Sequence, residues 1–364
     1  MATTDLSRQD NGGLGEALAT LRGRMPEASV SLADRLSRIN GRYIGTARDH
    51  ELRDHIDELI VNAASALGGE PGKRRALFVI GDSGSGKSTA IERAIANRKE
   101  FAPYEDHSGR LIYPMVSLEA PGSLTLKVLA IDLLRAIGYP VFKQLGEGEA
   151  WHLLKEQLVF RKVLFLHIDE MQHAVTSNNH ATIEHLSNTI KSLLQIPNWP
   201  LHIIMSGVPE LAKFRENDLQ MKNRSNIMEF TRMTSSEISM LTEIVRRIVE
   251  VDAEMIADEA ILSSNFIARL LHATDGAFGT CIELTRTTVS RILRKSASAP
   301  DDRKATVGVH HFEQAYATFS ACPADENIFT AKNWTTINPA NALKRMQDAF
   351  AHKRTARPKS KAEK

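Results

Sequence analysis

The chain of 364 residues is poor in cysteine and has no long apolar run. Its two cysteines, Cys281 and Cys322, are too few for a disulfide framework or a four-cysteine zinc site, which agrees with a reducing compartment. No stretch approaches the roughly 18 apolar residues of a membrane span. The first residues lack the basic-then-apolar layout of a signal peptide. We therefore expect a cytoplasmic, globular protein of about two domains with no membrane partner.

The small net charge of +2 hides an uneven distribution. Residues 344–364 hold eight basic and two acidic side chains, so this tail carries +6 and leaves −4 for the rest of the chain. A basic tail on a slightly acidic body fits an arm that touches nucleic acid or an acidic partner surface. A solvated tail that only aids solubility is an equally good interpretation.

The first two thirds of the chain alternate between short apolar runs and helical patterns. The runs are typical of buried parallel strands and lie at residues 76–80, 111–116, 163–168 and 201–205. Apolar residues at helical spacing lie at 32–66 (interrupted at 41–45), 124–137 and 183–194. Strands that alternate with helices predict an α/β fold, a three-layer structure with a parallel sheet.

The pattern changes after Thr234, where residues 234–237 form a capping box. Helices are expected at 265–273, 280–295 and 310–319, with no strand between them. We therefore expect four segments. They are a flexible stretch 1–30 with one short helix near 14–21, an α/β domain 31–234 that includes N-terminal helices, a small all-helical domain 235–320, and an extension 321–364 that ends in a short helix and the basic tail.

The strongest motif is residues 81–88, which match G-x-x-x-x-G-K-[ST] between a buried strand and a helix. In such a loop, backbone N–H groups cradle phosphates, Lys87 reaches the terminal phosphates, and the Ser88 hydroxyl ligates Mg²⁺. We therefore expect ATP and Mg²⁺ as cofactors. The predicted nucleotide-binding residues of this loop are Gly81, Asp82, Ser83, Gly84, Ser85, Gly86, Lys87, Ser88 and Thr89.

A second motif, Asp169-Glu170, ends the apolar run 163–168. The strand delivers Asp169 to the edge of the sheet beside the Mg²⁺ that Ser88 also ligates. Glu170 can then orient and deprotonate a water that attacks the γ-phosphate. The pair favours an ATPase over a small-molecule kinase, which needs an acceptor substrate rather than an activated water.

Three further positions carry weaker signals. Ser206 ends the run 201–205 and can contact the γ-phosphate or the attacking water, but a serine that opens a turn is ordinary. Arg224 can act as an arginine finger on a neighbour's nucleotide, in competition with Arg215, Arg232 and a plain surface role. His173 has no metal-spaced partner nearby and reads as structural.

This order of motifs resembles the AAA+ ATPases. Within them it is similar to the TniB/TnsC group, the ATP-dependent target regulators of DNA transposons, which are related to MuB. The resemblance covers about residues 35–319. It is carried by RYIG at 42–45, IDEMQH at 168–173, NTIK at 188–191, SGVPE at 206–210 and NR at 223–224.

The resemblance implies roles for several residues. Ser206 takes the sensor-1 position, which contacts the γ-phosphate or the attacking water, and Arg224 is the finger that acts on a neighbouring subunit. Arg42, Tyr43 and Ile44 pack near the adenine, although they can also simply close a helical turn. The chain departs from the Gly-x-x-Arg pattern of many lids because residues 276–279 end in glycine, so the resemblance leaves the lid arginine open, with Arg286 as one candidate.

The resemblance also implies ATP-dependent homo-oligomers, rings or filaments, around double-stranded DNA, and a transposase or targeting protein as partner. Contacts to DNA phosphates are expected from Arg110, Ser123, Thr125 and Lys127, for which a solvated face is the alternative. The predicted function is thus an ATPase that regulates transposition and leaves its DNA on hydrolysis. The alternative is a nucleotide-gated adaptor, similar to STAND proteins, that engages only proteins.

Overall fold

The computed structural model of the protein describes residues 11–122, 125–142, 144–174, 180–297 and 304–340. The chain divides into two compact units. The first, here called the sheet unit, comprises Met1–Ala19 and Gly45–Thr231. The second, the helical unit, comprises Thr20–Ile44 and Arg232–Lys364. Helix α1 (Asn11–Gly23) runs across the boundary between them.

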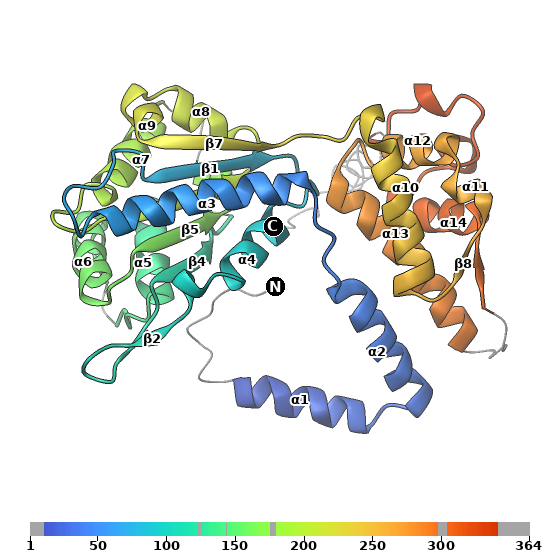
Figure 1. Ribbon diagram of the computed structural model, residues 1–364, viewed down its shortest axis with the longest axis horizontal. Coiled ribbons are helices and arrows are strands. Elements are labelled where there is room, and N and C mark those ends of the chain that lie inside the picture. Colours follow the sequence, from blue (N-terminus) through green and yellow to red (C-terminus); the bar gives the residue numbers. More distant parts are fainter. Residues whose placement is uncertain (1–10, 123–124, 143, 175–179, 298–303, 341–364) are drawn as a thin grey trace, which may run out of the picture. The chain divides into compact units, whose positions relative to one another are not determined.

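The sheet unit is built on five strands in the order β4-β5-β6-β1-β7 (Figure 1). The strands are β1 (Ala76–Gly81), β4 (Met115–Glu119), β5 (Phe165–Asp169), β6 (His202–Gly207) and β7 (Ser225–Phe230). All neighbouring strands are parallel, so their carboxyl ends meet along one edge of the sheet. The α/β class with a parallel sheet is confirmed. Strand β7 is the one that no continuous apolar run marks.

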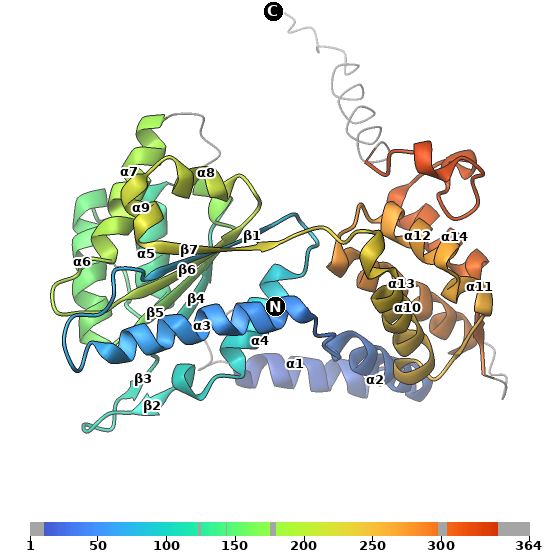
Figure 2. The ribbon, with the colours of Figure 1, turned by 45° about the horizontal axis from the view of Figure 1, so that its top comes forward.

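Helices cover both faces of this sheet (Figure 2). One face carries α3 (Ala47–Ser65) and α4 (Lys87–Ala96). The other carries α5 (Leu126–Ala136), α6 (Glu147–Phe160), α7 (His180–Leu193), α8 (Leu211–Glu216) and α9 (Leu219–Asn223). Because successive side chains of a strand point to opposite faces, β1 divides its residues between the two cores. Phe78 packs with the α5–α8 side, and Leu77 and Val79 pack with the α3–α4 side.

The apolar run 111–116 forms two strands instead of one. Leu111–Ile112 is β3, which pairs antiparallel with β2 (Tyr104–Glu105) in a small hairpin outside the sheet. β4 begins only after Pro114, which has no N–H to donate. Its carbonyl oxygen accepts hydrogen bonds from the backbone N–H groups of Leu164 and Phe165, both at 2.9 Å. Pro114 thus ends one pairing and starts the next.

The helical unit packs its elements around a separate apolar core. They are α2 (Glu27–Gly41), η4 (Ser235–Glu237), α10 (Ile238–Arg246), η5 (Arg247–Asp252), β8 (Ile256–Ala257), α11 (Glu259–Leu262), α12 (Ser264–Ala273), α13 (Phe278–Ala297), β9 (Thr306–Val307), α14 (Val309–Ser320), η6 (Ala324–Glu326) and η7 (Trp334–Thr336). The three helices expected between residues 265 and 319 are confirmed. The expectation that no strand lies among them is wrong, because β8 and β9 form a two-residue parallel pair.

Helix α2 belongs to the helical unit, although the sequence grouped residues from 31 onward with the sheet. The reason is its apolar stripe: Ile39 is buried in the core of the helical unit, and Leu32 and Leu36 pack against it. None of the described helices is long and apolar enough to cross a membrane. Ser123 and the basic tail within 341–364 lie outside the described residues.

Candidate functional site

The glycine-rich loop connects β1 to α4 at the carboxyl edge of the sheet. Gly86 caps α4 in a left-handed conformation with φ of 91°, which lets the chain turn sharply into the helix. Gly81 lies so close to β7 that an added Cβ would stand 2.8 Å from Cβ and 2.9 Å from the carbonyl oxygen of Phe230. The motif glycines thus serve both the turn and the packing of the loop against the sheet.

Two buried side chains of this loop, Ser85 and Lys87, lack a hydrogen-bond or ion-pair partner among the described residues. The Ser85 hydroxyl has no hydrogen-bond partner in the described part of the chain, although Ser85 is only 4% exposed. Lys87 is equally buried, and its ammonium forms no ion pair or hydrogen bond with any residue the structure describes. Buried polar groups are normally paired, so both fit a site for phosphate oxygens at the N-terminus of α4.

Asp169, at the end of β5, lies close enough to the start of α4 for the Ser88 hydroxyl to stabilise its carboxylate. Burial opposes ionisation of Asp169, but hydrogen bonds from Ser206, Ser88 and the Glu170 backbone outweigh it, so the pKa of Asp169 lies below its ordinary value. A carboxylate and a hydroxyl are ligands that suit Mg²⁺. Ser88 and Asp169 are therefore the residues that would hold it.

Glu170 follows directly and has a strained backbone, with φ of 53°. Its carboxylate accepts a hydrogen bond from the Gln172 side-chain amide. The other end of that amide accepts from the Val208 backbone N–H at 3.2 Å. Gln172 therefore ties Glu170 to the turn that follows β6.

Ser206, at the end of β6, is fully buried and donates its hydroxyl proton to Asp169 Oδ1 at 2.5 Å. His167 Nε2 lies 2.8 Å from the same hydroxyl oxygen, and His167 Nδ1 lies 2.7 Å from Ser117 Oγ. Burial lowers the pKa of His167 to about 4, against the opposing effect of the Asp169 charge. The ring is thus neutral at physiological pH. The contact of Ser206 with phosphate stays a prediction. Its hydroxyl group already donates its one proton in the hydrogen bond to Asp169.

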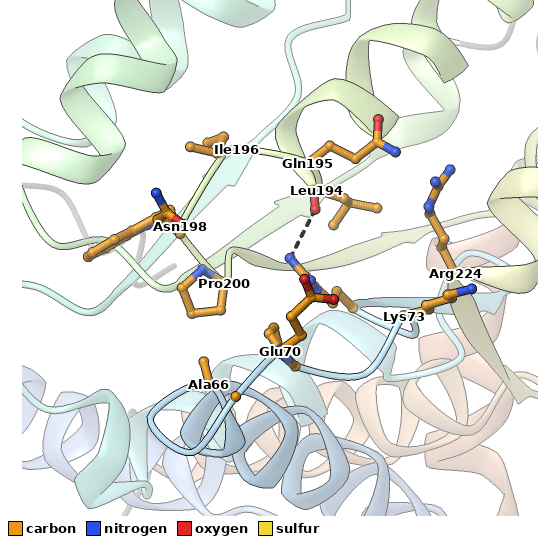
Figure 3. A pocket seen from close by; sticks show the side chains of 13 residues that line it. Ala66, Glu70, Lys73, Leu194, Gln195, Ile196, Asn198, Pro200 and Arg224 are labelled. Carbon is orange, nitrogen blue, oxygen red and sulfur yellow. Dashed lines mark hydrogen bonds between the residues drawn. The ribbon is translucent and has the colours of Figure 1, made fainter.

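Arg224 lies at the opposite, amino edge of the sheet. Its carbonyl oxygen accepts from the N–H groups of Arg75 (2.9 Å) and Ala76 (3.1 Å), which fixes it beside the start of β1. Its side chain lines a pocket of about 510 Å³ together with Lys73, Arg75 and Glu70 (Figure 3). Arg75 Nη1 donates to the Leu194 carbonyl oxygen at 3.2 Å. Burial lowers the pKa of Arg75; the charge of Glu70 opposes this shift, and the weaker effect of the Arg224 charge adds to it.

The two competing arginines are engaged elsewhere. Arg215 donates to Ser225 Oγ at 3.0 Å and to Glu216 at 2.6 Å, and its side chain is 12% exposed. Arg232 belongs to the helical unit, where it pairs with Asp275. Arg224 makes only one long side-chain contact that the structure defines, at 3.5 Å to Gln220 Oε1.

The segment before Arg224 is anchored by a half-buried ion pair. Lys191 of α7 donates to Asp218 Oδ2 at 2.7 Å, and the Ser187 hydroxyl donates to the same oxygen at 2.5 Å. Burial opposes ionisation of Asp218, but these two bonds lower its pKa to about 2. Asp218 also caps α9, the helix that leads to Arg224. The lysine of the NTIK segment thus helps to hold the expected finger.

Arg42, Tyr43 and Ile44 lie in the helical unit, and their contact with adenine stays a prediction. Ile44 is buried in the core of that unit, and Arg42 pairs at 2.6 Å with Asp252. Arg286 of α13 donates to the carbonyl oxygens of Asn40, at 3.2 Å, and Arg42. Burial lowers the pKa of Arg286, against the opposing charge of Asp252. Arg286 thus fixes the backbone that leads into Tyr43.

The described residues that are expected to contact DNA, Arg110, Thr125 and Lys127, have different local environments. Arg110 donates to Asp106 at 3.2 Å and lies over the Phe160 ring at 4.7 Å, so its charge is partly satisfied. Thr125 is the N-cap of α5 and accepts from the Val128 N–H at 3.2 Å. Lys127 is half-buried in the first turn of the same helix. Their contact with DNA stays a prediction.

Solved structures share this fold, and 432 of their chains match. The Aeropyrum pernix ORC2 protein, solved in ADPNP–ADP complexes, is 15% identical with a TM-score of 0.53, and the match covers 89% of this chain and 86% of that one. Cdc6p from Pyrobaculum aerophilum is 13% identical with a TM-score of 0.51, over 77% of this chain and 69% of that one. At such identities the likeness shows the fold alone.

Fold and motif order together define a P-loop ATPase of the AAA+ class. A family model described as the bacterial TniB protein matches residues 36–235. Because this match spans more than half of the chain, the protein belongs to the TniB family. No curated protein matches the chain.

Three residues at the site escaped sequence reasoning. Ser117 and His167 lie beside or inside predicted strands and belong to no motif, and Gln172 lies in the IDEMQH segment, where nothing marked it as a partner of Glu170. A histidine within the otherwise apolar run 163–168 was the one visible signal, because a buried polar side chain needs a partner. Its partners come from β4 and β6, and only the strand order reveals them.

Proposed function

We propose that the protein is an ATP-dependent regulator of DNA transposition. It assembles head-to-tail on target duplex DNA, recruits or activates a transposase, and leaves the DNA when ATP is hydrolysed to ADP and phosphate. Membership of the TniB family supports the role in transposition. The arrangement of the P-loop, Asp169 and Glu170 supports the hydrolysis.

The loop side chains and the two carboxylates have separate tasks in this reaction. Lys87 and the N–H groups of the loop bind the phosphates, and Ser88 and Asp169 hold the Mg²⁺, which would stabilise the charge that develops on them. Glu170 orients a water and accepts its proton as the oxygen attacks the γ-phosphorus, while the bond to the β-phosphate oxygen breaks. The nearness of the Ser88 hydroxyl to Asp169, which helps to lower the pKa of that carboxyl, supports this assignment.

The position of Arg224 is the observation that best supports head-to-tail assembly. β1 has six residues and lies between the P-loop and the Arg75–Arg224 contact, and at roughly 3.3 Å per residue it spans about 20 Å. An arginine side chain cannot bridge that distance, so Arg224 cannot serve the P-loop of its own subunit. A finger at one edge and a nucleotide at the other edge fit a head-to-tail interface, which forms rings or helical filaments.

Two inactive variants test this arrangement when they are mixed. Lys87→Ala subunits lose phosphate binding but keep Arg224, and Arg224→Ala subunits keep the P-loop but lose the finger. If Arg224 acts on a neighbour, an equal mixture regains up to about a quarter of the wild-type ATPase rate, because that share of the interfaces joins an intact P-loop to an intact finger. A mixture as inactive as either variant contradicts the proposal.

The DNA interaction needs a separate test with the Glu170→Gln variant, which should retain ATP. We expect this variant with ATP to bind a labelled duplex of any sequence, and the logarithm of the affinity should fall linearly with the logarithm of the salt concentration. ADP should abolish the binding. If the assembled, ATP-bound protein ignores DNA at low salt, the nucleotide-gated adaptor that engages only protein partners takes the place of the DNA-binding regulator.

A further inference from the structure

A continuous row of hydrogen bonds crosses the sheet on the face covered by α3 and α4. It begins at Ser117 on β4, passes through His167 on β5 and Ser206 on β6, and ends at Asp169. The register explains the row. Ser117 pairs directly with His167, and Ile168 pairs with Met205, so the next residues of both strands, Asp169 and Ser206, end side by side.

The direction of each bond follows from which groups can donate. The Ser206 hydroxyl has one proton, and an ionised Asp169 can only accept, so Ser206 donates to Asp169. The Ser206 oxygen must then accept from His167, which puts the ring proton on Nε2. His167 Nδ1 is therefore an acceptor, and Ser117 donates to it. All three protons point toward Asp169.

The row fixes one oxygen of the Asp169 carboxylate. Oδ1 accepts from the Ser206 hydroxyl at 2.5 Å and from the Glu170 N–H at 2.9 Å, and neither bond uses Oδ2. Two donors on one oxygen prevent the carboxylate from rotating. Outer partners of this kind orient metal ligands, and their loss typically lowers metal affinity by about 10–100-fold.

We propose that His167 is a positioning residue for the Mg²⁺–nucleotide site: by donating to Ser206 it holds the Asp169 carboxylate in the orientation that binds the metal. The inference rests on the proposed function only in taking Asp169 as a magnesium ligand. The proposal also gives Ser206 a role other than direct contact with phosphate. Its hydroxyl accepts from His167 and donates to Asp169, so it links the two residues.

Glutamine and asparagine at position 167 separate this role from simple packing. The longer glutamine places its amide nitrogen near the position of Nε2 and can still donate to Ser206. The shorter asparagine reaches only the position of Nδ1, so it can bond Ser117 and leaves Ser206 without a donor. Both variants introduce an amide of similar polarity into the same buried place, and thermal unfolding shows whether each remains folded.

The readout is the affinity for a fluorescent ADP analogue, measured in EDTA and across a Mg²⁺ titration. We expect the His167→Asn variant to need about 10-fold more Mg²⁺ for half of the magnesium-dependent gain in affinity. In EDTA its affinity should stay within about twofold of the wild-type value, since the P-loop is unchanged. The His167→Gln variant should restore the wild-type Mg²⁺ requirement to within about threefold.

Each other outcome overturns the proposal. A folded Asn variant with a normal Mg²⁺ requirement shows that the row does not orient Asp169. Equal defects in the Asn and Gln variants, or an equal loss of affinity in EDTA and in Mg²⁺, show a packing role. Because the assay measures binding, a wild-type protein that does not hydrolyse ATP would contradict the proposed function and leave this test intact.

Discussion

The two edges of the parallel sheet satisfy their charged side chains in different ways. At the carboxyl edge, the carboxylates of Asp169 and Glu170 accept hydrogen bonds from side chains of the same unit. The buried Lys87 has no anionic partner among the described residues. At the amino edge, Lys73, Arg75 and Arg224 share one pocket with a single carboxylate, Glu70. The first edge gathers the residues that we propose for ATP hydrolysis. The second has an excess of positive charge, which a negative group from another molecule can neutralise.

Removing the side chain at the amino edge should have the largest effect. We expect Arg224→Ala to lower kcat by about 10³-fold or more, the usual range for an arginine finger. The melting temperature should hardly change, because the described contacts of this side chain are limited to one long bond. The ATPase rate, measured at protein concentrations high enough for assembly, checks this.

Lys222→Ala is the matched control, since it removes an exposed cation two residues away that, among the described residues, pairs only with the side chain of Glu216. It should retain the wild-type rate. If both variants lose activity equally, the charge of the surface matters and the position of Arg224 does not.

At the carboxyl edge, Glu170→Gln should lower kcat by roughly 10²–10⁴-fold, the contribution expected from a general base. Binding of ATP should be unchanged, because Lys87 and the loop remain. Single-turnover hydrolysis and nucleotide affinity measured on the same sample separate the two effects. If the variant hydrolyses ATP at the wild-type rate, Glu170 is not the general base of the reaction.

The contrast between the edges also explains what could be predicted from the sequence. The P-loop and the pair Asp169-Glu170 are local patterns at the ends of apolar runs, so their chemistry and position could be predicted together. The hydrogen-bonded row behind Asp169 could not, because its bonds from Ser206 to Asp169 and from His167 to Ser206 join residues 37 and 39 positions apart and depend on strand order. Arg224 needed a resemblance for its role, and the pocket around it depends on a loop that carries no motif.

The turn after β6 gives a smaller and sharper test of the carboxyl edge. An added Cβ at Gly207 would stand 2.3 Å from Gln172 Oε1, so Gly207→Ala must displace the amide that holds Glu170. We expect a loss of about 1–3 kcal/mol in the free energy of unfolding, because the displaced amide leaves its bonds to Glu170 and Val208 unmade, together with a change in kcat. Denaturant unfolding measures the first effect.

Gly148→Ala in α6 is the control for this substitution. Nothing lies within 4 Å of a Cβ added there, and alanine favours a helix, so this variant should be as stable as the wild type or more so, by up to about 1 kcal/mol. Equal stability of Gly207→Ala and Gly148→Ala would contradict the close packing of Gln172 against the turn.

A buried histidine near each edge gives the last comparison. His167 bonds through both ring nitrogens, whereas His202, at the start of β6, donates Nδ1–H to the Pro200 carbonyl and has no partner for Nε2 among the described residues. Burial lowers the pKa of His202 to about 4, below the ordinary value of about 6.5. Between these values the unfolded chain binds a proton that the native protein does not, so stability is full above pH 6.5 and falls toward pH 4.

Replacing His202 with phenylalanine should therefore flatten the pH dependence of stability. Between pH 4 and 6.5 the slope of the unfolding free energy should fall by about 1.4 kcal/mol per pH unit, the contribution of one histidine. At pH 8 the change should be small, because the ring contact with Phe165 can persist and the loss of the Pro200 bond is offset by the removal of the unpartnered, buried Nε2. Denaturant unfolding at several pH values measures the slope. An unchanged slope would show that the native protein does not lower the pKa of His202, although its ring is fully buried at the amino edge of the sheet.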